Sequence, residues 1–252
     1  MKTLLMLLAV AALAAPASAL TYDQNVTPDV IFGSGNINGS FTVDVAQSPV
    51  GVVELGLRGK LRFDASNLPQ NIFNSNGDGS YTFLAGFPTG GAGWAGPTTP
   101  YWNFEWSVNA DQDGGSGLTL DDFTYELGLD FDPSPGGTNY LVFDPITPSV
   151  SVPAWDHAIG DNLGTVVSNT NPVVYASNLN TYNVAQNSWS YEFFNDGPFA
   201  SFDPTDDGVY EIYLKAFDAS GSEVAHTAIS IVVGNAVGNE DATFSAVKTL
   251  FR

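Results

Sequence analysis

Two alternating segments between residues 101 and 131 constrain the fold of this chain more than any other feature. The apolar positions of the first segment are Trp102, Phe104, Trp106 and Val108. Those of the second segment are Phe123, Tyr125, Leu127, Leu129 and Phe131. Side chains alternate between the two faces of a β-strand, so each segment predicts a strand with one buried face and one solvated face. The stretch between them, rich in Asp and Gly, predicts that the two strands form a hairpin.

Similar short alternating or apolar segments recur along the chain, separated by Gly, Pro, Asn and Asp. These segments are residues 41–45, 52–63, 81–87, 141–143, 173–175, 188–194, 210–216 and 227–233. No stretch has the long 3.6-residue periodicity of a helix. The pattern therefore predicts an all-β protein, an antiparallel β-sandwich of the immunoglobulin-like or jelly-roll-like type. The Asp-x-Gly-x-Tyr sequence that ends at Tyr210 resembles the tyrosine corner of immunoglobulin-like sandwiches.

The first 19 residues have the three parts of a secretory signal peptide. Lys2 supplies the positive charge, residues 4–14 are apolar, and Ala17 and Ala19 occupy the small positions of a cleavage site. The apolar run is shorter than the roughly 20 residues that span a bilayer. We therefore expect export with cleavage after Ala19, and a mature chain without a membrane span. The sandwich is expected as one large domain over residues 20–234, followed by a tail, residues 235–252, that no pattern assigns.

The charge balance narrows the classes of partner. The chain has 27 acidic and 7 basic residues, for a formal net charge of −20. Phosphate groups would repel such a chain, which argues against binding to nucleic acid or anionic membranes. The sequence contains no cysteine. An exported chain without disulfides must be stabilised by its core, with bound metal as a further candidate.

Oxygen-bearing side chains alternate ahead of a glycine in three loops, at residues 74–79, 109–114 and 203–208. This is how a calcium loop begins, although no acid follows at the twelfth position of an EF-hand. The middle loop is the most acidic, and crowded carboxylates repel each other unless an ion bridges them. The candidate calcium ligands there are Asn109, Asp111, Asp113, Asp121 and Asp122. The alternative for all three loops is an ordinary β-turn, which uses the same residue types.

Arg58, Lys60 and Arg62 lie on the polar side of the strand expected over residues 52–63. One hypothesis pairs them with acidic side chains of the second segment, which would make the two strands neighbours. Those acids are Asp122, Glu126 and Asp130. The alternative is a patch that binds sulfate or uronate groups of a glycan.

Few residues are candidates for ligand binding. His157 follows Trp155 and Asp156, and this cluster could serve as a general base or a sugar contact. The alternative is that it holds a loop through hydrogen bonds. Trp94 and Tyr101, together with Trp155, lie outside the expected core faces and could stack on sugar rings. No serine-hydrolase, zinc-protease or phosphate-loop motif is present, so no catalytic residue is predicted.

A set of short stretches is distinctive when taken together: residues 57–63, 69–83, 102–106, 120–128, 155–157 and 207–210. In this set the chain resembles bacterial exported proteins of the PEP-CTERM-associated type, over about residues 30–234. Members with a sorting tail end in Val-Pro-Glu-Pro, a membrane span and a basic cluster. The C-terminal residues here have none of these, so release outside the cell is expected. The resemblance implies a surface or exopolysaccharide-associated setting and no established activity.

The sequence as a whole predicts a secreted, non-enzymatic β-sandwich protein of the extracellular matrix or cell surface, with calcium as a candidate stabilising ion. The alternative is a carbohydrate-binding module, and the third hypothesis is a glycan-active hydrolase. The expected partners are extracellular polysaccharide or surface proteins. Exposed aromatic rings beside a groove would favour the binding module. A cleft with two carboxylates, one of them strongly desolvated, would favour the hydrolase.

Overall fold

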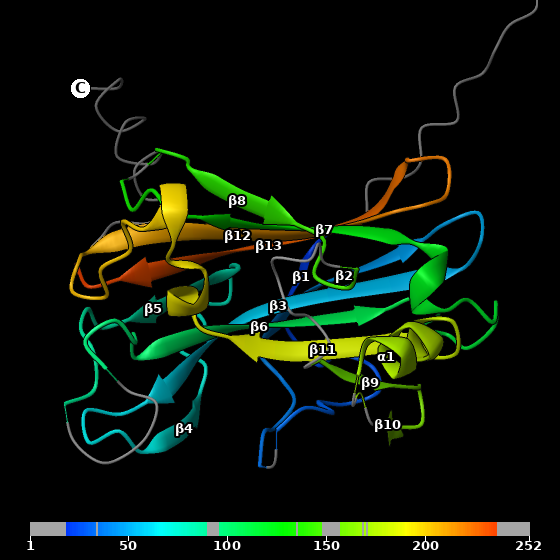
Figure 1. Cartoon of the computed structure of the whole chain (residues 1–252), viewed down its shortest axis with the longest axis horizontal. Helices are drawn as coiled ribbons and strands as arrows, with labels where there is room; N and C mark the ends of the chain where they lie inside the picture. The colour runs from blue at the N-terminus through cyan, green and yellow to red at the C-terminus, as the bar shows by residue number, and fades with distance from the viewer. Residues whose placement is uncertain are drawn as a thin grey trace, which may run out of the picture.

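A computed structural model of the chain describes residues 19–33, 35–89, 96–134, 136–147, 157–167, 169 and 171–235. Within these ranges the protein consists of two β-sheets packed face to face, which confirms the predicted all-β sandwich (Figure 1). The expected signal peptide, apart from its last residue, lies outside the described residues, and so does the expected tail beyond its first residue. No helix in the described ranges is long and apolar enough to cross a membrane.

The first sheet is formed by eight strands: β1 (Thr21–Gln24), β2 (Phe41–Gln47), β3 (Val52–Phe63), β4 (Pro69–Ile72), β6 (Trp102–Asn109), β9 (Ala158–Gly160), β10 (Val166–Val167) and β11 (Val184–Trp189). Their order is β1-β2-β3-β6-β11-β9-β10, and β4 pairs with the far end of β3. The long strands β3 and β6 therefore occupy the centre of this sheet.

The second sheet is formed by five strands: β5 (Ser80–Phe83), β7 (Thr124–Asp130), β8 (Tyr140–Phe143), β12 (Gly208–Phe217) and β13 (Glu223–Val233). Their order is β5-β13-β12-β7-β8, and only the β13–β5 pair is parallel. The short helices are η1 (Leu120–Asp122), α1 (Pro172–Leu179), η2 (Tyr191–Phe194) and η3 (Gly197–Phe199). They lie in connections rather than in either layer.

The core between the sheets is built from the apolar positions that the alternation singled out. All nine apolar residues of the two opening segments are buried, and so are the inward positions of β12 and β13. Tyr210 belongs to this core, where its ring packs against Trp102, Tyr191 and Phe202. Its hydroxyl has no hydrogen-bond partner among the described residues, so the predicted tyrosine corner is wrong.

The predicted hairpin is also wrong. β6 pairs with β3 and β11 in the first sheet, whereas β7 pairs with β12 and β8 in the second. Residues 110–123 therefore cross from one sheet to the other. Alternation establishes that a segment is a strand and which side is apolar, but it carries no information about which strand lies beside it.

Three further expected strands differ in the structure. The one expected over residues 81–87 ends at Phe83. Residues 173–175 lie in α1, because Asn171 accepts hydrogen bonds from the amides of Val173 and Val174 and Pro172 occupies the first turn. This capping outweighs the β-branched residues of the segment. The strand expected over residues 188–194 ends at Trp189, and the chain then turns into η2.

The outward-facing side of the central strands is polar and yet mostly buried, with only Arg62 and Ser188 half-buried. We call it the polar face; its members are Glu54, Arg58, Lys60 and Arg62 from β3, Asn103, Glu105, Ser107 and Asn109 from β6, and Gln186 and Ser188 from β11. We call residues 25–33 and 35–39 the N-terminal strap, because they run across this face on the side away from the second sheet (Figure 1). The prediction that Asn103, Glu105 and Ser107 face solvent is wrong; all three are buried.

The basic residues of β3 have a different partner from the one predicted. Arg58 and Lys60 both pair with Glu105 on β6, at N–O distances of 2.5 and 3.3 Å. Asp122, Glu126 and Asp130 belong to η1 and β7 and lie on the other side of the sandwich. The hypothesis of internal charge neutralisation therefore holds for Arg58 and Lys60, with β6 in place of β7 as the neighbouring strand.

Candidate functional site

The predicted calcium loop forms the crossing between the two sheets. The carboxylate of Asp111 accepts hydrogen bonds from Ser116 N (3.0 Å), Ser116 Oγ (2.6 Å) and Gly117 N (2.9 Å). Burial alone would raise the pKa of Asp111, but these donors hold it below its ordinary value. Both oxygens of Asp111 therefore close the loop on itself, and a metal would have to replace these donors.

Asn109 lies at the end of β6 and belongs to a cluster of amide side chains. Its Oδ1 accepts from Asp111 N (3.1 Å) and Asn183 Nδ2 (2.8 Å). Its Nδ2 donates to Thr27 O (3.0 Å) and Asn162 Oδ1 (2.8 Å). Asn109 is fully buried. The cluster ties the strap, β6 and two later loops together, which is a structural role.

The remaining predicted ligands lie on the surface in turns of their own. Asp113 accepts from Gly115 N (3.0 Å), and Asp122 accepts from Thr119 N (2.8 Å) and caps η1. Asp113, Asp121 and Asp122 are exposed. Among the described residues, no three His, Cys, Asp or Glu side chains form a group that could hold a metal ion. Calcium binding at this loop stays a prediction.

His157 is a core residue. It is 3% exposed, and the centre of its ring lies 4.9 Å from the ring centre of Trp106 and 5.4 Å from that of Trp189. Its Nδ1 lies 3.1 Å from the hydroxyl of Tyr175, which in turn donates to Ile146 O. Burial lowers the pKa of His157 to about 3, so the ring is neutral at physiological pH. These contacts fit the alternative in which His157 holds a loop in place.

The other candidate ligand residues are placed as follows. Trp94, Trp155 and Asp156 lie outside the described residues. Tyr101 is half-buried beside the start of β6, and its carbonyl accepts hydrogen bonds from the amides of Arg62 and Phe63. The structure therefore does not bring Tyr101 and His157 into one site, because they lie at different places along the first sheet.

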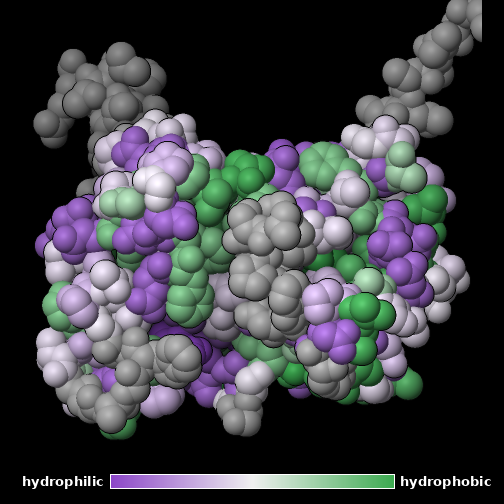
Figure 2. Space-filling view, in the orientation of Figure 1, coloured by the Kyte–Doolittle hydropathy of each residue, from purple (hydrophilic) through white to green (hydrophobic). Residues whose placement is uncertain are grey.

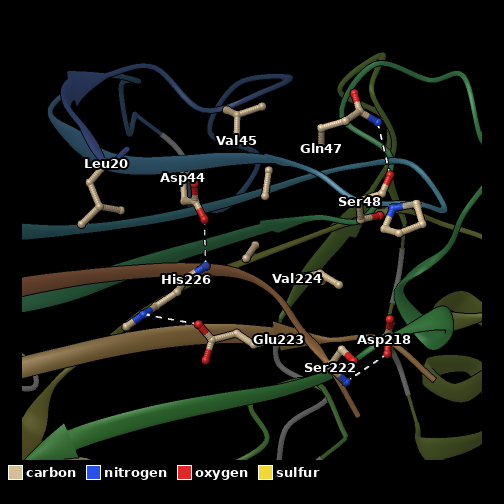
Figure 3. Close-up of a pocket in the computed structure, with 13 residues that line it drawn as sticks. Leu20, Asp44, Val45, Gln47, Ser48, Asp218, Ser222, Glu223, Val224 and His226 are labelled. Carbon is tan, nitrogen blue, oxygen red and sulfur yellow. Dashed lines mark hydrogen bonds and ion pairs between the residues drawn. The ribbon is translucent and has the colours of Figure 1, made fainter. Parts of the chain in front are cut away.

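Sequence patterns did not indicate a groove between β2 and β13, where one strand of each sheet lies close to the other (Figure 3). The groove has a volume of about 700 Å³, within the range of about 300–1,000 Å³ that is typical of ligand sites. It is lined by residues from β2, β13 and the turns beside them: Leu20, Asp44, Val45, Ala46, Gln47, Ser48, Pro49, Asp218, Ser222, Glu223, Val224, Ala225 and His226. No motif marks it, because its walls come from opposite ends of the chain.

The groove is rich in hydrogen-bond acceptors. Asp44 points from β2 towards β13, where its Oδ2 accepts from the backbone amide of His226 at 2.8 Å (Figure 3). Glu223 lies 3.7 Å from the His226 ring and 3.2 Å from Lys215. Burial lowers the pKa of His226, which favours its neutral form. None of the described lining residues is Lys or Arg, so the groove suits hydroxyl or ammonium donors better than anions.

The outer surface does not display one large apolar patch on the face in view. Figure 2 shows hydrophobic residues in separate small groups among hydrophilic ones. The most exposed large apolar side chains belong to different elements: Leu84, Leu163, Val173 and Phe193. Scattered exposed apolar residues are ordinary on a protein surface and do not by themselves identify a docking site.

No family model matches the chain, and comparison with curated proteins and with solved structures found no match either. The resemblance to PEP-CTERM-associated exoproteins therefore stays a prediction.

Proposed function

We propose that the protein is a secreted, non-enzymatic β-sandwich of the extracellular matrix or cell surface. The observation that carries this proposal is the position of its desolvated carboxylates. A hydrolase places such a group in a cleft, where it meets the substrate. Among the described residues, the carboxylates whose pKa burial raises are Glu54, Asp130 and Asp144, and none of the three lines the groove described above.

Each of these carboxylates holds backbone in place. Glu54 accepts from Thr27 N (2.7 Å), which fastens the strap. Asp130 accepts from Asn139 N (2.6 Å) and so closes the β7–β8 connection. Asp144 accepts from three backbone amides at 2.8–3.2 Å. Groups committed to structural hydrogen bonds support a structural or binding role over acid–base catalysis.

The non-enzymatic part of the proposal is tested with the full chain and soluble polysaccharides such as alginate, dextran and xylan. We expect no release of reducing ends above a heat-inactivated control. Release that survives further purification and is lost in Glu54→Gln or Asp144→Asn would contradict the proposal. Export is tested separately by expressing the chain in a bacterial host. The mature protein should be recovered outside the cytoplasm with Leu20 at its N-terminus.

Calcium stabilisation is a proposal for the loop between the sheets. It is supported by the exposed carboxylates of Asp113, Asp121 and Asp122, which lie in or next to a loop rich in glycine. Calcium should raise the melting temperature, and chelation should lower it. The matched variants are Asp113→Asn, which should reduce the effect, and Asp203→Asn in a similar but distant turn, which should not. An unchanged melting temperature in calcium would contradict the proposal.

A further inference from the structure

The polar face continues beyond the strap into a small pocket. Among the described residues, the hydrogen bonds between the strap and the side chains of β3 reach no further than Lys60, which donates to Asn36. The pocket lies next to Lys60 along this face, and its volume is about 160 Å³. It is lined by Arg62, Phe63, Thr99, Asn103, Ser190, Glu192 and Phe193. These residues come from β3, β6, η2 and the connections next to them.

Two buried side chains that line this pocket have polar atoms without a partner. Asn103 is 2% exposed and Ser190 is 3% exposed. Asn103 donates from Nδ2 to Ser188 Oγ at 3.2 Å, but neither its Oδ1 nor Ser190 Oγ has a hydrogen-bond partner in the described structure. A buried polar atom left in this way costs about 1–3 kcal/mol. Buried polar groups are normally satisfied, so each exception calls for an explanation.

The other lining groups have complementary chemistry. Within the described residues, the Arg62 guanidinium forms no ion pair, although it lies 5.2 Å from the centre of the Phe63 ring. Glu192 is held by the hydroxyls of Thr98 and Thr99, at 3.3 and 2.6 Å. Phe193 is 62% exposed, so its ring forms an open apolar wall. The pocket thus combines donors, acceptors and aromatic surface, with one positive and one negative side chain.

We propose that this pocket binds one pyranose ring of an extracellular polysaccharide. A sugar presents hydroxyls that both donate and accept, together with an apolar face of C–H groups. Asn103 Oδ1 and Ser190 Oγ are closed to solvent in the free protein, so binding would turn both side chains towards the pocket. The sugar hydroxyls would then donate to Asn103 Oδ1, exchange hydrogen bonds with Ser190 Oγ, and accept from Arg62. The exposed ring of Phe193 would cover the apolar face. The proposal goes beyond the structural role above and does not depend on calcium.

The volume of the pocket limits the size of the ligand. A volume of about 160 Å³ is roughly half the lower end of the range of about 300–1,000 Å³ that is typical of drug-sized ligands. The pocket therefore holds a single sugar unit, and the rest of a polysaccharide would lie outside it. Affinity for a free monosaccharide should be in the millimolar range, since only a few hydrogen bonds and one ring contribute.

The test is an NMR titration of the full ¹⁵N-labelled chain with D-glucose, D-galactose, D-mannose, N-acetyl-D-glucosamine and D-glucuronate. At least one of the uncharged sugars should shift the backbone amides of Asn103, Ser190 and Phe193 and the side-chain amide of Asn103. Ser190→Ala and Phe193→Ala should each weaken that binding by about 3–10-fold. Both changes remove groups with little structural role, so both variants should fold.

Matched controls distinguish this site from others. Ser177→Ala on α1 and Leu163→Ala, both at exposed positions outside the pocket, should leave the affinity unchanged. The proposal is overturned if no sugar in the panel shifts these amides. It is also overturned if the shifts lie only in the groove between β2 and β13, or if Ser190→Ala and Phe193→Ala bind as wild type does. Shifts caused by glucuronate and inorganic sulfate alone would identify an anion site at Arg62 and would likewise overturn it.

Discussion

The two ends of the polar face differ in how their buried groups are satisfied. Under the strap, Arg58 donates to Glu105 and to the carbonyls of Ile37 and Gly39, and its guanidinium lies about 4 Å from the centres of two aromatic rings. At the other end, Asn103 and Ser190 are equally buried but keep polar atoms without partners. Arg58 Nη2 and Glu105 Oε1 also lack hydrogen bonds, but both take part in ion pairs. The buried groups under the strap thus have partners, whereas Asn103 Oδ1 and the neighbouring Ser190 Oγ have none among the described residues.

This difference shows what the strap contributes. Sheet residues that face away from the core must find hydrogen-bond partners if another layer covers them. The strap supplies such partners through its backbone, as when Ile31 N donates to Gln186 Oε1 and Asp29 O accepts from Gln186 Nε2. Where the strap stops, a hydroxyl-rich ligand could supply them instead. The predictions below test this contrast between the two ends.

The largest effect is expected from Glu105→Ala, which leaves the buried Arg58 and Lys60 without their carboxylate. Breaking a buried pair in this way costs about 3–5 kcal/mol of unfolding free energy. Urea unfolding of the variant measures the loss. The matched control is Glu223→Ala, whose exposed pair with Lys215 should contribute at most about 1 kcal/mol. Equal losses of unfolding free energy in the two variants would mean that water reaches the ion pairs of the polar face.

The next effect concerns pH. Burial raises the pKa of Glu54 from 4.5 to about 7, so the folded protein binds this proton more tightly than the unfolded chain does. Glu54 therefore contributes stability below pH 4.5 that is lost as the pH rises through about 7. The contribution of Glu54 to the unfolding free energy thus falls by about 3 kcal/mol between low and high pH. Glu54→Gln keeps the neutral form, so at about pH 8 it should be more stable than wild type by up to this amount.

The comparison of Glu54→Gln with wild type should be made across the pH range. The advantage of the variant should shrink on acidification and vanish near the ordinary pKa of a glutamate, at about pH 4. His157 has the opposite effect, because its lowered pKa removes stability as the pH falls below 6.5. That contribution is common to both proteins and cancels in the difference. If the unfolding free energies of Glu54→Gln and wild type differed by the same amount at all pH values, Glu54 would not be desolvated by the strap.

A smaller loss is expected from Gln186→Leu, which removes the partners of Ile31 N and Asp29 O. The variant also loses the bond from Gln186 Nε2 to Ser107 Oγ, and three lost hydrogen bonds should lower the unfolding free energy by about 2–3 kcal/mol. Hydrogen exchange should locate the change, with faster exchange at Ile31 and unchanged exchange in β12 and β13. Uniformly faster exchange would show that the strap and the sandwich unfold as one unit.

The smallest effect is expected at the incomplete end. Ser190→Ala removes a buried hydroxyl that has no hydrogen-bond partner among the described residues. Its unfolding free energy should therefore not fall, and it should rise by up to about 1 kcal/mol, because the small void left by the hydroxyl offsets part of the relief. A loss as large as that of Gln186→Leu would mean that Ser190 has a structural partner, and the contrast between the two ends would disappear.

The fold class and the inward faces of the strands could be predicted, because burial in a two-layer sandwich imposes a two-residue period. Trp102 and Leu127 are in the core for this reason. The partner of each strand could not be predicted in the same way. β6 and β7 have the same period whether they form a hairpin or lie in different sheets, and only long-range packing decides between the two.

The polar positions were predicted less well than the apolar ones. Glu105 alternates with core residues, which normally indicates solvent exposure, and nothing nearby in sequence indicates that the strap will cover it. The neutralisation of Arg58 by some carboxylate was predictable from the excess of acids, but its identity was not. Neither the groove nor the pocket could be predicted, because each combines segments that are distant in sequence.

The strap also sets an order of events in folding. Its hydrogen bond from Ile31 to Gln186 spans 155 residues, so the strap, which is synthesised early, obtains this partner only after β11 has been made. Contacts of such separation form slowly, because a long stretch of chain must be ordered before they close. Closure of the polar face by the strap is therefore expected to be slow. Until then Arg58 and Glu105 remain in contact with water, and closure of the strap excludes that water.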